Sequence, residues 1–179
     1  SEVIAIDALI NINDNKLVAD GQIALSNNNL TGLGSSFELG YREKPQRFKK
    51  FFNNKIIESW FNFEIFDKDF DISKVGYLPR NNLKKYQFGI ALLQEKNGKI
   101  FNDYILDMSM NYAENFDNVQ LLESFDLGWK STFSNFWNFN ININFLGDYY
   151  NDRLYDYYLN ETEHSRVVKM SASESYYVG

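Results

Sequence analysis

The chain has 179 residues, a net charge of -6, 44% hydrophobic residues and a mean hydropathy of -0.43. This length fits one domain, which we expect to span residues 1–179. No apolar run approaches the roughly 18 residues of a spanning helix, which excludes a helical membrane protein. The negative charge argues against a nucleic-acid partner, and the lack of cysteine excludes disulfides.

Strand-like alternation of apolar and polar residues begins near the first residue and recurs along the chain. Apolar residues occupy alternate positions over 4–12, 17–25 and 33–41. The sequences NDNK at 13–16 and SNNNLTG at 26–32 separate these segments, and both are rich in turn-forming residues. The first 41 residues therefore predict three strands joined by short turns.

The alternation returns after a charged loop and again after a second long loop, over 57–65, 86–92 and 104–112. The sequence EKNG at 95–98 predicts a hairpin turn of the Asn-Gly kind. Further strands are predicted at 119–129, at 137–145 and, more weakly, near 166–172. We find no helical period, so the predicted fold class is all-β, an antiparallel up-and-down meander of about nine strands of roughly 9 to 12 residues.

The sequence WNFNININF at 137–145 shows the alternation most clearly, because every second residue is asparagine. Successive side chains of a strand point to opposite faces, so this strand has an apolar face and an amide face. Other predicted strands also place carboxylates and amides on one face. If the sheet closes into a barrel, the predicted lumen-lining residues are Asn138, Asn140, Asn142, Asn144, Asp107, Asn111, Glu58, Asn62 and Glu64.

The apolar face is expected to meet either lipid or a protein core. The predicted strand lengths match the roughly 9–11 residues of a membrane-spanning strand better than the 5–6 typical of soluble sheets. Two apolar faces read Trp-Phe-Ile-Ile-Phe and Tyr-Leu-Met-Met-Tyr, with aromatics at both ends, as the aromatic girdles of membrane barrels require. Glu123 argues against lipid, because it shares a face with Phe125 and Leu127. Either the strand carries a bulge there or that face does not meet lipid.

The sequence FDISKVGYLPRNNLKKY at 70–86 resembles a signature of one bacterial family. Its members are outer-membrane proteins with an N-terminal domain like family-9 carbohydrate-binding modules and a C-terminal β-barrel of unassigned function. In that family a phrase close to FNPEVGFVPR precedes a barrel strand. The matching residues here are Phe70, Val75, Gly76, Tyr77, Leu78, Pro79 and Arg80. The resemblance implies part of the barrel without the carbohydrate-binding domain, and a link to carbohydrates by analogy.

Three loops carry candidate binding residues. The sequence DKDFD at 67–71 opens like a calcium loop but lacks the glycine and the final acid of an EF-hand, so a solvated acidic loop is the expectation. The basic, aromatic loop at 42–55 suits either bulk water or lipid phosphates. The segment at 150–161 fits an aromatic girdle or a saccharide-binding surface, and its candidates are Tyr150, Tyr155, Tyr157 and Tyr158.

These features predict a bacterial outer-membrane β-barrel that binds or passes a polar solute such as a saccharide. We expect a lipid bilayer and a polar small molecule or glycan as partners, with other outer-membrane chains as further candidates. We expect no catalytic residues, no metal and no cofactor. Because about nine strands fall short of a large barrel, the chain is expected to be a fragment of a longer one. The alternative is a soluble β-sandwich or curved sheet that binds a ligand.

Overall fold

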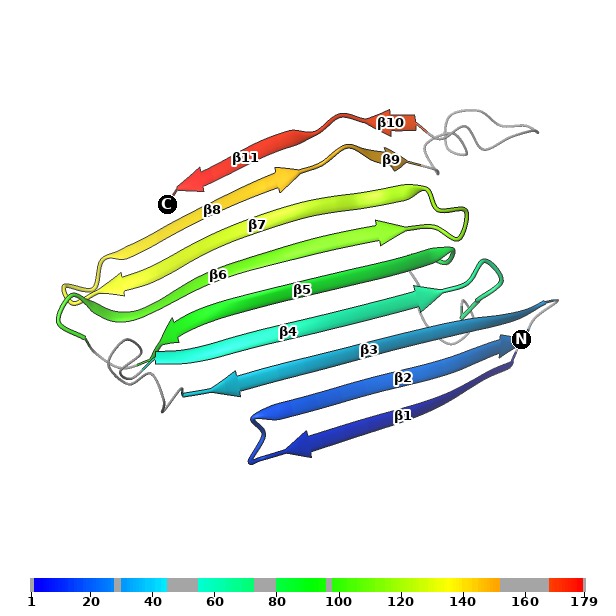
Figure 1. Ribbon diagram of the computed structural model, residues 1–179, viewed down its shortest axis with the longest axis horizontal. Coiled ribbons are helices and arrows are strands. Elements are labelled where there is room, and N and C mark those ends of the chain that lie inside the picture. The colour runs from blue at the N-terminus through cyan, green and yellow to red at the C-terminus, as the bar shows by residue number, and fades with distance from the viewer. Residues whose placement is uncertain are drawn as a thin grey trace.

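A single curved sheet of antiparallel strands dominates the computed structural model (Figure 1). The structure describes residues 2–27, 30–44, 55–72, 80–95, 98–151 and 168–178. Its strands are β1 (Glu2–Ile12), β2 (Leu17–Asn27), β3 (Thr31–Glu43), β4 (Lys55–Phe66), β5 (Leu83–Gln94), β6 (Phe101–Glu114), β7 (Gln120–Phe133), β8 (Asn138–Leu146), β9 (Tyr149–Asn151), β10 (Val168–Met170) and β11 (Ser173–Val178).

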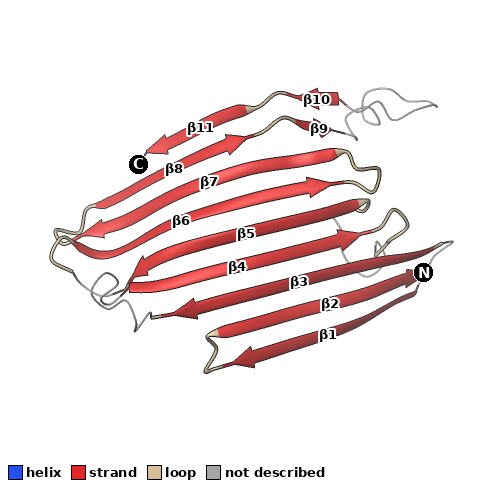
Figure 2. Ribbon diagram, viewed as in Figure 1, coloured by secondary structure: helices blue, strands red, loops and turns tan. Residues whose placement is uncertain are grey.

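The strand order follows the chain, β1-β2-β3-β4-β5-β6-β7-β8-β11, and every neighbouring pair is antiparallel. The predicted all-β meander is therefore confirmed, and the described residues contain no helix (Figure 2). It follows that they include no helix able to cross a membrane. The sheet order ends at β1 and β11, so the described strands form an open sheet with two edges.

The predicted turn at 13–16 is confirmed, and its geometry explains its composition. Asn13, Asp14 and Asn15 have φ values of 54°, 54° and 64°, and Lys16 N donates to Asn13 O at 3.1 Å. Asn and Asp tolerate this left-handed conformation better than other residues with a side chain. The predicted turns at 26–32 and 95–98 lie partly outside the described residues.

The ninth strand of the sheet was predicted at the wrong place. The weak segment near 166–172 contains only the three-residue β10, which pairs with β9 in a small separate sheet. The strand that pairs with β8 is β11, which begins at Ser173. Asp148 supports this region: its carboxylate accepts from Ala172 N at 2.8 Å and pairs with Lys169 at 2.6 Å. The hydrogen bond from Lys169 is the main cause that holds the pKa of Asp148 below its usual range.

The loop at 67–72 folds over the face of the sheet that carries Gly34 and Phe66. Phe70 is only 3% exposed and stacks on Phe66, with ring centroids 5.6 Å apart. A Cβ on Gly34 would lie 2.5 Å from the Phe70 ring, so the ring needs a residue without a side chain there. Asp67 closes the loop, because its carboxylate accepts from Leu33 N at 2.7 Å and from Asp69 N at 3.0 Å.

No conventional hydrophobic core is present in the described part of the chain. Its buried hydrophobic residues are Ala24, Ile56, Phe70, Ala91 and Ala113. Three of these are alanines, whose small side chains bury little apolar area. The sheet is therefore not stabilised by a second layer of large apolar side chains. The polarity and exposure of its two faces then indicate what surrounds each of them.

We predict that Phe70→Ala destabilises the protein by about 3 kcal/mol, because it removes a buried ring and leaves a cavity over Gly34. Phe136→Ala is the matched control, since Phe136 is 78% exposed, and it should change stability by less than about 0.5 kcal/mol. Urea unfolding of both variants in detergent micelles measures the difference. Equal effects would show that Phe70 does not anchor the loop.

Candidate functional site

The polar side chains of the sheet gather on one face, and the register explains why. Residues paired across antiparallel strands point to the same side of a sheet. Asp20 pairs with Glu38, Glu38 with Asn62, Asn62 with Gln87, and Gln87 with Asn111. A continuous polar row thus crosses the sheet from β2 to β6. We call this side of the sheet the polar face.

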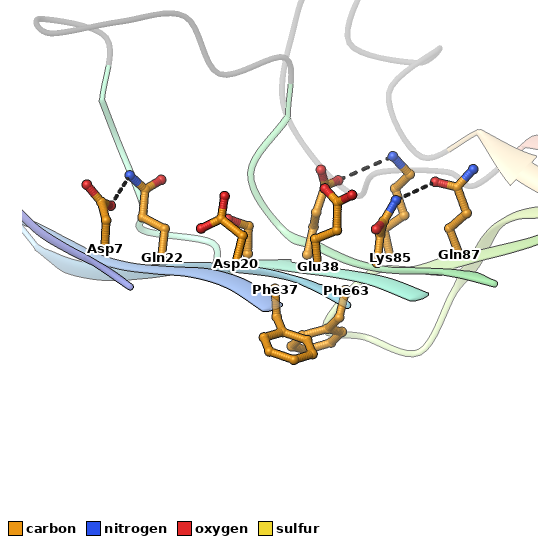
Figure 3. A pocket seen from close by; sticks show the side chains of 11 residues that line it. Asp7, Asp20, Gln22, Phe37, Glu38, Phe63, Lys85 and Gln87 are labelled. Carbon is orange, nitrogen blue, oxygen red and sulfur yellow. Dashed lines mark hydrogen bonds and ion pairs between the residues drawn. The ribbon is translucent and has the colours of Figure 1, made fainter. Parts of the chain in front are cut away.

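A hollow of about 480 Å³ lies on the polar face over β1 to β5. Figure 3 shows Asp7, Asp20, Gln22, Glu38, Lys85 and Gln87 projecting from one side of the sheet, with Phe37 and Phe63 on the other. Such a volume falls within the range of small-molecule sites. The hollow is therefore the described region most able to receive a polar ligand.

The residues predicted to line a lumen all share the polar face. Asn142 pairs with Gly128, Gly128 with Asp107, Asp107 with Ala91, and Ala91 with Glu58, so one row joins four strands to Asn142. The remaining predicted residues follow by alternation along their strands, namely Asn138, Asn140, Asn144, Asn111, Asn62 and Glu64. Their common face agrees with the sequence pattern, and their lumen role stays a prediction.

Asp126 is the centre of the densest hydrogen-bond network on the polar face. It accepts from Asn111 Nδ2 at 3.0 Å and from Asn144 Nδ2 at 2.5 Å. Ser124 Oγ accepts from Asn111 at 3.1 Å and lies 3.4 Å from Asp126 Oδ2. One carboxylate therefore links β6, β7 and β8, a role that alternation alone does not reveal.

Two ion pairs and one amide pair order the other half of the polar face. Arg42 and Glu58 are 2.8 Å apart, and Lys85 and Glu64 are 3.3 Å apart. Asn62 Nδ2 donates to Gln87 Oε1 at 3.1 Å. Partly exposed ion pairs contribute little to stability, so these contacts mainly fix side-chain positions. Carboxylates nevertheless outnumber cations on this face, with Asp7, Asp20, Glu38, Glu58, Glu64, Asp107 and Asp126 against Arg42, Lys85 and Lys130.

Trp60 is a polar-face residue that the sequence reading overlooked. It pairs with Gly40 on one side and Gly89 on the other. A Cβ on Gly89 would lie 2.1 Å from Trp60 Cζ2 and 2.2 Å from Cε2, so the indole covers this glycine. The signal was present in the sequence, because Trp60 falls between Glu58 and Asn62 in the polar phase of β4.

The opposite side, which we call the apolar face, is the more exposed one. In β6, Leu106, Met108 and Met110 are 50%, 44% and 60% exposed, while their neighbours Asp107 and Ser109 are partly buried. Ile23 and Leu25 of β2 are likewise more exposed than Ala24 and Ser26, whereas β1 and β11 are exposed on both faces. Further exposed apolar side chains on this face include Ile4, Ile6, Ile10, Ile23, Phe37, Phe88, Phe145 and Tyr176.

Aromatic rings gather near both ends of the apolar face. At one end Tyr86 lies 5.2 Å from Phe63 and 6.3 Å from Tyr112, measured between ring centroids. At the other end Trp129 lies 5.2 Å from Phe139 and 6.1 Å from Phe101. The aromatic ends expected from the sequence thus come together across neighbouring strands into two clusters.

Only uncharged residues occupy the apolar face of β4 to β8 between these aromatic clusters; Phe88, Met110, Ile90, Met108, Leu127 and Ile143 are among them. Charged residues stand just beyond. Lys84 pairs with Glu114 at 3.0 Å two residues past Tyr86 and Tyr112, and Lys55 Nζ lies 6.0 Å from the Tyr104 ring centre at the other end. The apolar face therefore has an uncharged band with polar margins.

Glu123 lies at a margin of this band. It pairs with Tyr112, near the start of β7, and accepts from Gln120 Nε2 at 2.8 Å. The register is irregular close by, between Ala113 and Glu114. Glu123 therefore argues less strongly against a lipid-facing surface, because its carboxylate lies at the level of the tyrosines and not in the middle of the band.

The predicted loop candidates are only partly described. Tyr150 belongs to β9, and Arg42, Lys44 and Lys55 flank the basic loop. Tyr155, Tyr157, Tyr158 and the basic residues at 45–54 lie outside the described residues, as does the segment 73–79 of the motif-like stretch. Its ends are described, and Phe70 anchors the first of them.

A family model described as a domain of unknown function (DUF5916) matches residues 1–177, so the chain belongs to this family. Comparison with curated proteins and with solved structures gives no match. The family description names neither an activity nor a ligand.

We predict that Asp126→Ala destabilises the protein by about 2 kcal/mol, because two amides lose a charged acceptor. Asp103 of β6, which is exposed and pairs with Thr132 of β7, provides the control, and Asp103→Ala should change stability by less than about 0.5 kcal/mol. Urea unfolding of the Asp126→Ala, Asn144→Ala and double variants gives their coupling, which should exceed about 0.5 kcal/mol. Strict additivity would contradict the network.

Proposed function

For this member of the family, we propose that the sheet is part of a membrane-spanning β-barrel that binds or passes a polar solute. One observation carries the proposal: large apolar side chains from strands as far apart as β1, β6 and β11 are exposed on one face of the sheet, and on β6 they are more exposed than their polar neighbours. Soluble proteins rarely expose such an extended apolar surface without a partner. A bilayer outside and water inside accommodate both faces.

Leaving the side chains of the apolar face in water costs free energy. Each large apolar side chain left in water forgoes about 1.5–3 kcal/mol of burial free energy. Ile6, Met110 and Tyr176, from strands far apart in the sheet, are all at least 60% exposed. A soluble β-sandwich would cover such residues with a second layer, and in the described part of the chain none lies there. Lipid therefore explains this face better than the soluble alternative.

The dimensions of the apolar face also support a bilayer. Tyr104 and Tyr112 stand at the two aromatic ends of β6, eight residues apart, which is about 26 Å of strand. Strand tilt shortens this distance along the membrane normal, toward the roughly 25 Å apolar band of known barrels. Charged residues such as Lys84 and Lys55 then fall at the headgroup level, where long side chains reach water.

The side chains of the polar face indicate the chemical class of the solute. Its amides supply both donors and acceptors, as a hydroxyl-rich solute such as a saccharide requires. We propose binding or passage, with no chemical step assigned to any residue and no cofactor. The resemblance of residues 70–86 to outer-membrane barrel proteins supports the bacterial outer membrane as the location.

Barrel closure requires partners for both edges of the sheet. A long open edge presents unpaired backbone groups, which cannot stand in lipid. β1 is eleven residues long and lies at one edge, and β11 lies at the other. The proposal therefore includes further strands, from a longer chain or from other outer-membrane chains, that pair with β1 and β11.

We predict opposite tolerance for arginine at two adjacent positions of β6. Met108 is in the middle of the apolar band, so Met108→Arg should destabilise the protein folded in phospholipid vesicles by about 2–4 kcal/mol. Ser109 points to the polar face and pairs with Asp126, so Ser109→Arg should cost less than about 1 kcal/mol. Urea titration in vesicles measures both. Equal costs for the two variants would exclude lipid from the apolar face.

A further inference from the structure

Trp60 is a large aromatic side chain on the polar face, where water alone does not account for it. The other tryptophan in a sheet strand, Trp129, belongs to an aromatic cluster of the apolar face. Trp60 instead stands among polar side chains, with Glu58 and Asn62 two residues away on either side. An indole on a polar surface leaves apolar area next to water, which calls for a ligand or a neighbour that covers it.

The Trp60 indole lies over Gly89. A Cβ on Gly89 would lie 2.1 Å from Cζ2, 2.2 Å from Cε2 and 2.8 Å from Cη2, so the ring occupies the space that any side chain at this position would fill. The indole is therefore on the polar face, close to the backbone of β5. Gly40, the other partner of Trp60, has no atom within 4 Å of an added Cβ, so the space beside the indole is open.

Hydrogen-bonding groups border the ring on the side of the hollow. Asn62 and Gln87 line the hollow and occupy the polar-face positions next to Trp60 and Gly89 along β4 and β5. Their mutual hydrogen bond of 3.1 Å fixes both amides at this border. Glu38 and Asp20 line the same hollow, one and two strands beyond Asn62. A flat aromatic surface thus adjoins a depression lined by amides and carboxylates.

This combination matches the chemistry of a sugar ring. A pyranose has an apolar C–H face, which packs on an aromatic ring, and equatorial hydroxyls, which bond to amides and carboxylates. The charges of the polar face narrow the class further. Among the residues that the structure describes, no cation pairs with Asp20 or Glu38, and carboxylates are in excess on this face, so an anionic glycan would meet repulsion.

We propose that Trp60 and the adjoining hollow form a binding subsite for a neutral saccharide, with the sugar ring stacked on the indole. The inference deepens the proposed function and rests on it, because it assumes that the polar face is open to solute. Trp60 supplies the stacking surface, Gly89 leaves the space that the indole occupies, and Asn62, Gln87 and Glu38 bond to hydroxyls.

The test uses the full chain reconstituted in phospholipid vesicles, with cellotetraose and maltotetraose as neutral probes and tetragalacturonate as the anionic one. Calorimetric titration measures the dissociation constants. At least one neutral probe should bind, and tetragalacturonate should bind at least tenfold more weakly at low salt. Trp60→Ala should weaken neutral binding at least tenfold, and Gly89→Ala should also weaken it because the added Cβ displaces the indole.

Trp137→Ala is the control, since Trp137 is 74% exposed in the turn between β7 and β8, and it should leave binding unchanged. If Trp60→Ala fails to fold, Trp60→Phe keeps a smaller ring and should weaken binding about threefold. Failure of both neutral probes, preference for tetragalacturonate, or unchanged binding by the Trp60 and Gly89 variants overturns the subsite. If the protein tolerates Ser109→Arg but not Met108→Arg and yet binds no saccharide, the saccharide subsite is contradicted and the proposed barrel is not.

Discussion

The cross-strand register of the sheet is the constraint on which the rest of the structure depends. Pairing from β1 to β8 is continuous, with register shifts only near the ends of the β6–β7 pair, so each residue's face follows from its position in the chain. A slip of one residue in any strand would exchange the faces of all its side chains. Asn144 and Asn111 meet at Asp126 because this register is kept. The aromatic clusters of the other face depend on the same pairing.

A sheet built this way stabilises itself unevenly. Hydrogen bonds connect the side chains of its polar face. Small residues such as Gly89 and Ala91 are buried on that face, and the Trp60 ring covers Gly89. Its apolar side makes contacts only within one layer. The free energy that a soluble protein gains from its core has to come here from the surroundings of the apolar face. In the proposed barrel, folding and insertion into lipid are one process, and the polar face lines the interior as a consequence.

Alternation in the sequence was enough to predict eight of the nine strands of the main sheet, their antiparallel order and the face of every predicted polar residue. It was not enough for features that depend on contacts between residues distant in the sequence, or on which neighbouring strand a side chain covers. The alternation assigns Trp60 to a face, but only the pairing with Gly89 shows where the indole lies. Phe70 anchors a loop because Gly34, far away in the sequence, leaves room for its ring. β11 was missed because its six residues mix serine, glutamate and tyrosine, which gives a weak pattern.

The most direct test of the membrane assignment is spin-label accessibility along residues 137–145, measured in vesicles with oxygen and with a water-soluble paramagnetic reagent. Oxygen partitions into lipid, so labels at Phe139, Ile141 and Ile143 should respond to oxygen. Labels at Asn140, Asn142 and Asn144 should respond to the water-soluble reagent. If the labels at Phe139, Ile141 and Ile143 are shielded from both, the apolar face is covered by protein and the barrel is contradicted.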